Sequence, residues 1–306
     1  MAAQNPMAQI PNTPPHEAGR GETLLLMLGC SCLWASGFLF MRLLTGQIEP
    51  EAMAGARAGI AALLLAVLFA LRGERITPYP HEWWPFLIIG TLNGWLPNTL
   101  TAFALTQIST ATSAMIQASG PLMVAVMAHF MFAEERLTLR RLSGIVLGFL
   151  GMGLLIGPDA LNPGTQGQKG FLSMTAVAVC YALGNLYTRH RRAIPPLRLA
   201  LGQQIISTFV ALPIAYGLKG PDSLSALSDH WLYVFALGSI ATAVPISLFM
   251  IMISKTGPTR AAMVGYLMPI FATLFSILFV GESVGLRELS GGAVILCGIW
   301  IATAKR

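Results

Sequence analysis

Hydrophobic residues fill long uninterrupted runs along this chain, and polar residues collect in short stretches between the runs. The runs are apolar on all sides rather than at every second position, so they do not resemble the strands of a membrane barrel. About 20 apolar residues are enough for a helix to cross a bilayer. The pattern predicts an all-α polytopic membrane protein with ten spans, at residues 23–41, 52–71, 83–105, 110–132, 142–157, 170–188, 198–218, 231–253, 259–280 and 287–303.

Two stretches decide how the first spans are read. Residues 1–22 are rich in proline and show no apolar period, so we expect a short disordered cytoplasmic tail. The run at 23–41 is longer than a signal-peptide core of roughly 7–15 residues and lacks an evident cleavage site, which predicts an uncleaved span. The stretch from Trp83 to Ala133 has no charged side chain, and the polar break at 106–110 divides it into two spans.

The composition agrees with a membrane protein. Hydrophobic residues make up 55% of the 306 residues and charged residues 10%, against about 25% charged in a soluble domain. This excludes a soluble enzyme and a disordered chain. The four cysteines lie inside apolar runs without zinc-like or CxxC spacing, so we expect no disulfide scaffold, metal or cofactor. The net charge of +6 alone would also suit a nucleic-acid partner, which the placement of the charges argues against.

Basic residues are distributed unequally between the two sides of the membrane. Fourteen Lys and Arg residues lie on the side of the N-terminus, four lie on the other side, and Arg57 falls within the second span. Cytoplasmic loops are enriched in Lys and Arg, so we expect both termini in the cytoplasm of a bacterial-type inner membrane.

The second half of the chain repeats the first at an offset of about 148 residues. Each half, at 23–157 and 170–303, holds five spans, and an odd number of spans inverts the second half relative to the first. Inverted repeats are typical of secondary transporters, whose substrate site lies near the midplane between the halves. The most telling matches are Trp83 with Trp231, Pro97 with Pro245, Pro121 with Pro269, Glu134 with Glu282, and the Leu-Arg-x-Leu-Ser-Gly strings at 139–144 and 286–291.

Several motifs resemble the drug/metabolite transporter superfamily, and in particular its ten-helix EamA-type branch. They are the segment from Trp34 to Phe38, Arg42 at the end of span one, Arg57 early in span two, Pro121 in span four, and Ala133 to Leu137. The resemblance covers nearly the whole chain. It implies an inner-membrane exporter of amino acids or similar metabolites, with aromatic and neutral amino-acid exporters of the YddG type as the preferred match.

Other functions remain as alternatives. A sugar-phosphate or nucleotide-sugar antiporter, or a drug exporter, would belong to the same superfamily. Phosphate-bearing substrates need cationic clamps, whereas no Lys or Arg lies at the midplane. An intramembrane enzyme is less favoured because the spans lack paired Asp, metal-binding or Ser-His motifs. We expect lipid and a small-molecule substrate as partners, no nucleic acid, and a monomer rather than a dimer.

Polar and aromatic residues near the span centres are candidates for the substrate site. An unpaired amide costs several kcal/mol in hydrocarbon, so these groups should face the bundle or a wet cavity. For single Ser and Thr residues, interhelical hydrogen bonds are the favoured interpretation, and a midspan aromatic equally suits packing. The candidate substrate-binding residues are Trp34, Ser36, Asn93, Trp95, Asn98, Gln117, Tyr181, Asn185, Thr242 and Tyr266.

Prolines and charges complete the sequence-based expectations. Pro97, Pro121, Pro245 and Pro269 interrupt four spans at repeat-related positions and are candidate hinges, with a static bend as the alternative. Arg57 is an intramembrane charge that could attract a carboxylate or bond a backbone carbonyl. We expect Arg42 to snorkel to the lipid headgroups.

Two further expectations concern packing and energy coupling. Glycines in spans five and ten predict a close helix contact, either between these spans or in a dimer. All thirteen acidic residues lie in the tail, in loops or at span ends, which predicts transport without obligatory proton coupling.

Overall fold

The computed structural model describes residues 20–131, 138–157, 162, 164–190, 194–256 and 263–303. Most of these residues are helical, and the described part of the chain contains no β-strand. The longer elements are α1 (Arg20–Leu44), α2 (Pro50–Leu71), α3 (Trp83–Ile89), α4 (Leu96–Leu105), α5 (Thr110–Ala118), α6 (Gly120–Met131), α7 (Leu139–Ile156), α8 (Gln166–His190), α9 (Pro196–Lys219), α10 (Asp222–Asp229), α11 (Trp231–Gly238), α12 (Val244–Thr256), α14 (Val264–Phe275) and α15 (Leu286–Thr303).

The described helices confirm the all-α polytopic fold and its ten spans. Four predicted spans are chains of shorter pieces. The pieces α3, η2 (Gly90–Trp95) and α4 follow one another without a loop, as do α11, η4 (Ser239–Ala243) and α12, and α14 and η5 (Ser276–Val280), and only Ser119 separates α5 from α6. Six continuous segments of the described residues are long and apolar enough to cross a membrane, and two of them, Thr110–Phe130 and Trp231–Met252, combine shorter pieces. The short helix α10 was not predicted from the sequence. The tail, Ala133 to Leu137 and Glu134 lie outside the described residues.

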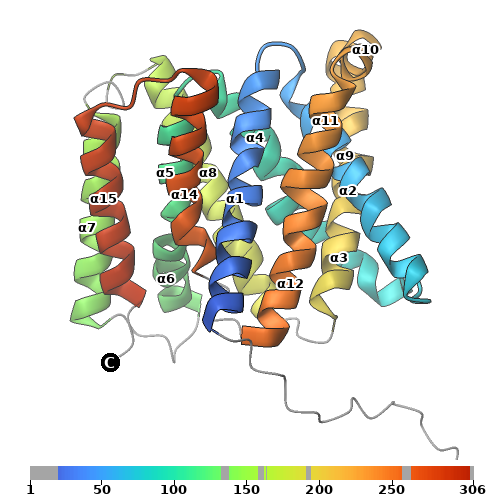
Figure 1. Cartoon of the computed structure of the whole chain (residues 1–306), viewed down its shortest axis with the longest axis horizontal. Coiled ribbons are helices and arrows are strands. Elements are labelled where there is room, and N and C mark those ends of the chain that lie inside the picture. The colour runs from blue at the N-terminus through green and yellow to red at the C-terminus, as the bar shows by residue number, and fades with distance from the viewer. Residues whose placement is uncertain are drawn as a thin grey trace, which may run out of the picture.

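The ends of α1 and α15 define two ends of the bundle. In Figure 1, α1 begins and α15 ends at the lower end, while α1 ends and α15 begins at the upper end. An even number of spans requires this arrangement, and the sequence-based orientation would make the lower end cytoplasmic.

The first helix of each half packs into the other half. Helix α1 lies against α12, η4 and α14 of the second half, as Figure 1 shows, and α8 lies against α4, α5 and α6 of the first half. Helix α2 packs on its repeat equivalent α9, and α7 packs on α15. These reciprocal contacts follow the two-fold relation expected of inverted repeats.

Glycines bring α7 and α15 into backbone contact. A Cβ added at Gly298 would lie 2.5 Å from the backbone nitrogen of Gly148, and one at Gly144 would lie 2.6 Å from the backbone nitrogen of Ala302. A residue with a side chain therefore cannot occupy either position without moving a helix. The sequence left two uses for these glycines open, and the structure uses them between spans five and ten of one chain.

Candidate functional site

A central cavity of about 560 Å³ lies between the two halves. Its walls come from α5 and α6 of the first half and from α8 and α14 of the second half, with Phe38 of α1 at one side. Arg141 at the start of α7 and Ala302 near the end of α15 also line the cavity. Both residues belong to the lower end of the bundle, so the cavity extends toward that end.

Four of the candidate substrate-binding residues come together in this cavity. Gln117 of α5 comes from the first half, and Tyr181 and Asn185 of α8 and Tyr266 of α14 come from the second half. Tyr181 is half-buried and contributes a phenol, while Gln117 and Asn185 contribute amides that both donate and accept hydrogen bonds. The cavity therefore combines apolar walls with several neutral polar groups.

Prolines shape the cavity at equivalent positions in the two halves. Pro121 and Pro269 line it and have no N–H, so they cannot bond the carbonyl oxygens four residues earlier, at Gln117 and Gly265. Span four is broken here, because α5 ends at Ala118 and α6 begins at Gly120. A Cβ added at Gly120 or Gly265 would meet nothing within 4 Å, which is consistent with backbone that faces the open space.

Arg57 lies in a buried polar cluster outside the lining of this cavity. Its Nε donates to Thr242 Oγ1 at 2.7 Å, and its Nη1 donates to Asn98 Oδ1 at 2.9 Å and lies 3.7 Å from Met41 Sδ. Asn98 in turn donates to the Gly94 carbonyl at 2.8 Å. Two candidate substrate-binding residues therefore hold Arg57, Asn98 from its own half and Thr242 from the other half.

Of the remaining candidates, Trp34, Ser36 and Trp95 are engaged with neighbouring groups, whereas Asn93 Oδ1 is buried without a hydrogen-bond partner among the described residues. The described residues that line the cavity do not include Trp34, Ser36, Asn93 or Trp95. The Trp34 ring lies 5.2 Å from Phe249, Ser36 donates to the Leu33 carbonyl at 2.6 Å, and Trp95 Nε1 donates to Thr91 at 3.2 Å.

Spans three and eight open into π-helical turns just before Pro97 and Pro245. The π-helical segments are η2 and η4, at repeat-related positions. Pro97 leaves the carbonyl of Asn93 without its helical donor, and the Gln203 side chain of α9 donates to that carbonyl at 3.0 Å. The second half therefore stabilises the irregular turn of the first, and the role of these prolines as hinges stays a prediction.

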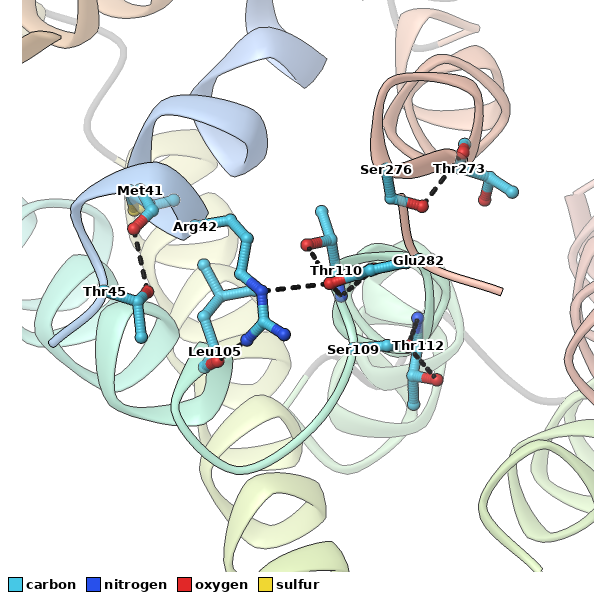
Figure 2. Close-up of polar contacts among 10 residues, drawn as sticks. All are labelled: Met41, Arg42, Thr45, Leu105, Ser109, Thr110, Thr112, Thr273, Ser276 and Glu282. Atoms are coloured by element: carbon cyan, nitrogen blue, oxygen red, sulfur yellow. Dashed lines mark hydrogen bonds and ion pairs between the residues drawn. The ribbon is translucent and has the colours of Figure 1, made fainter. Parts of the chain in front are cut away.

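A polar cluster joins the halves at the upper end. Figure 2 shows Arg42 of α1 and Glu282, which follows η5, pointing toward one another, with Arg42 Nε 3.0 Å from Glu282 Oε1. Arg42 also donates to the Leu105 carbonyl, and Glu282 accepts from the backbone N–H and hydroxyl of Thr110 at 2.9 Å each. We name Arg42, Leu105, Thr110 and Glu282 the upper-end cluster.

The upper-end cluster shows that the expectation of a snorkelling Arg42 was wrong. The sequence analysis also did not predict the contact between Arg42 and Glu282. Arg42 does not extend freely toward lipid headgroups, because an anion and a carbonyl of its own bundle satisfy its guanidinium. The charges at Arg42 and Glu282 were visible in the sequence. Their contact was not, because 240 residues separate them and the packing of α1 on the second half creates it.

A second ion pair joins the halves at the lower end. Arg198 of α9 donates to both carboxylate oxygens of Glu82, at 2.5 and 2.7 Å, and also to the carbonyls of Arg75 and Thr77. The hydrogen bonds from Arg198 hold the pKa of Glu82 below its usual value, although burial opposes that shift. Within the described residues, no group of three His, Cys, Asp or Glu side chains could hold a metal.

Comparisons with known proteins agree with this architecture. A solved crystal structure matches with a TM-score of 0.65 and 20% identity over 93% of this chain and 97% of that protein, which shows a shared fold. The uncharacterized transporter YoaV of Bacillus subtilis is 18% identical, over 92% of this chain and 97% of its own. The uncharacterized inner membrane transporter YedA of Escherichia coli K12 is 24% identical, over 89% and 88%.

The family profile extends the likeness to both halves of the chain. The profile of the EamA-like transporter family matches residues 22–157 and again residues 168–304. These two matches fall on the two sets of helices that enclose the central cavity. The chain is therefore a membrane transporter that belongs to the EamA-like family of the drug/metabolite transporter superfamily.

Proposed function

We propose that this transporter exports small amphiphilic metabolites, amino acids above all, by alternating access through the central cavity. The observation that carries the proposal is the cavity of about 560 Å³ between the halves, within the range of roughly 300–1,000 Å³ usual for small-molecule sites. Its amides suit an ammonium and a carboxylate, and its tyrosine rings suit an apolar side chain.

The two ends of the bundle support an alternating-access cycle. The cavity reaches the lower end, whereas the upper-end cluster ties α1 and α5 to the second half. With the lower end in the cytoplasm, this arrangement is an inward-facing state ready to accept substrate. Opening the upper end and closing the lower end would then release the substrate outside, with the proline-interrupted helices as the moving parts.

Flux into proteoliposomes tests the proposal. The purified chain is assayed for counterflow of a panel of labelled amino acids, with sugar phosphates in the same panel. We expect saturable amino-acid uptake that falls at least tenfold in Gln117→Leu and Asn185→Leu, since each removes a cavity amide. Gln47→Leu, at an exposed loop position, is the matched control.

The panel also decides between substrate classes. Uptake of sugar phosphates in the absence of amino-acid uptake would contradict the proposal and favour the antiporter alternative. Arg141 is the one charged residue among the described residues that line the cavity, which argues against a phosphate clamp built from several cations.

A further inference from the structure

Arg57 is a buried guanidinium whose described partners are all neutral. Arg57 is 9% exposed and lies within α2, one of the helices long enough to cross the membrane. Nε and Nη1 contact a hydroxyl, an amide oxygen and a thioether. Among the residues that the structure describes, none of the ion pairs includes Arg57. No carboxylate of the described residues therefore compensates its positive charge.

A charge at this depth without a described carboxylate partner needs a reason. Removing an ion from water costs several kcal/mol even after the protein relaxes, and neutral hydrogen-bond partners offset that cost only in part. A methionine at this position would pack without the penalty. Charged residues inside membrane spans are functional-site candidates for this reason.

The guanidinium borders the wall of the central cavity. Arg57 Nη2 lies 3.7 Å from the point where a Cβ on Gly37 would stand, and the next residue, Phe38, lines the cavity. Tyr181 lines the cavity as well and lies within electrostatic reach of Arg57. Arg57 itself does not line the cavity, so its contact with a substrate requires a rearrangement of this wall during the cycle.

Among the residues that the structure describes, the lining of the cavity carries charge of one sign. Of the described lining residues, only Arg141 carries a charge, and no carboxylate is among them. An organic cation in the cavity would therefore meet Arg141 and no carboxylate among the described lining residues, with Arg57 behind the wall, in an environment where water screens charge poorly. An anionic group would be attracted, and the planar fork of arginine matches a carboxylate in two parallel hydrogen bonds.

We propose that Arg57 selects cargo that carries a carboxylate and discriminates against organic cations. This inference rests on the proposed function and narrows its substrate class to amino acids and related organic acids. During the cycle the substrate carboxylate exchanges for Asn98 or Thr242 on the guanidinium, and these two side chains hold Arg57 in position when the cavity is empty.

Three probes that share one ring test the selection. Phenylalanine, its cationic amide and its deaminated acid, 3-phenylpropionate, are compared as competitors and as substrates in proteoliposomes that contain the purified full chain. We expect the two carboxylates to be preferred over the amide by about tenfold or more. Arg57→Gln should bring this preference close to one, and Arg57→Lys should retain part of it.

A second variant keeps the test independent of any folding defect in Arg57→Gln. Asn98→Asp places a carboxylate 2.9 Å from Arg57 Nη1, while the side chain keeps the shape of asparagine and Arg57 stays in the protein. It should lower the preference for carboxylates and raise the uptake of the amide, a gain that misfolded protein cannot produce. Arg42→Gln, which removes another cation of the same half, should leave the preference unchanged.

The outcomes separate the selection from the transport proposal. Equal uptake of phenylalanine and its amide by the native protein, or an unchanged preference in Arg57→Gln and Asn98→Asp, would overturn the role of Arg57 while amphiphile transport stands. Uptake of sugar phosphates but of none of the three probes would overturn both proposals.

Discussion

Arg198 and Glu82 show how single residues fasten the two halves at the lower end. The pair is almost fully buried, and the carbonyls of Arg75 and Thr77 complete the hydrogen bonding of the guanidinium. Tyr79 contributes a backbone N–H to Glu82 and an aromatic ring 5.0 Å from the guanidinium carbon. Removal of either charge would leave the other one buried without an ionic partner.

We expect Glu82→Gln to lower the stability of the protein by roughly 3–5 kcal/mol, as is usual when one partner of a buried ion pair is removed. The folded-state pKa of Glu82 is lowered, so its stabilising contribution is complete above the unfolded pKa of about 4.3. That contribution is lost as the pH falls from there through the lowered folded-state pKa. Thermal unfolding in detergent should show this acid loss in the native protein and a flatter profile in the variant.

Lys255→Gln is the control for the Glu82 variant, because its partner Glu22 and its own side chain are both substantially exposed. Exposed pairs contribute about 0–1 kcal/mol. An acid profile of Glu82→Gln that coincides with that of the native protein would contradict the assignment.

At the scale of elements, the backbone contact between α7 and α15 predicts that a methyl group added at the contact lowers stability, whereas one added elsewhere on α7 does not. Gly298→Ala places a methyl group 2.5 Å from the Gly148 nitrogen, which is backbone and cannot rotate away. Overpacking of this kind costs about 1–3 kcal/mol. The same change at Gly153 of α7 meets nothing within 4 Å. Thermal unfolding should therefore separate the two variants, and equal melting temperatures would show that the helices are not packed as described.

The upper-end cluster makes a prediction about conformational balance. Arg42→Gln removes a partly buried ion pair, worth about 1 kcal/mol, from the closed upper end, which corresponds to an about fivefold shift in population. A cysteine placed at Ala125, in a chain without the native cysteines, should then react faster with a membrane-impermeant maleimide added from the upper side. Lys219→Gln, which breaks an exposed pair with Glu49 at the same end, should not change that rate.

The sequence predicted where the helices lie along the chain better than it predicted which side of each helix faces the cavity or the other half. Long apolar runs and repeated Trp and Pro positions were sufficient for ten spans and the duplication. They could not separate Tyr181, which lines the cavity, from Asn98, which holds Arg57. A helix that is apolar all round has no hydrophobic period to mark its inner face, and contacts between the halves depend on packing that no local pattern encodes.

At the scale of the whole molecule, the placement of its acids bears on energy coupling. Proton-driven carriers usually keep a titratable relay inside the membrane. In the described part of this chain, Glu82 and Glu282 are ion-paired near the ends of spans. The sequence pattern predicts that all thirteen acids of the chain fall in the tail, in loops or at span ends. We therefore expect substrate flux in proteoliposomes to continue without a pH gradient and to change little when one is imposed.

His129 near the lower end of α6 is the group to control for in this experiment. His129→Ala should leave the response to a pH gradient as it is in the native protein. Uphill accumulation driven by a proton gradient alone, and abolished in this variant, would contradict uncoupled transport.

The reciprocal packing of α1 and α8 has a consequence for how the protein is made. Helix α1 leaves the ribosome first, yet its partners include Pro245, whose carbonyl accepts from Cys30, and Val264, whose carbonyl accepts from Ser31. Those partners are synthesised only after some 200 further residues have been added. The first span therefore enters the bilayer before its packing partners exist, and neither half can complete its packing until the other half has been inserted. A substitution in the second half that disturbs these contacts would therefore impair the assembly of α1 during biogenesis before it affects transport.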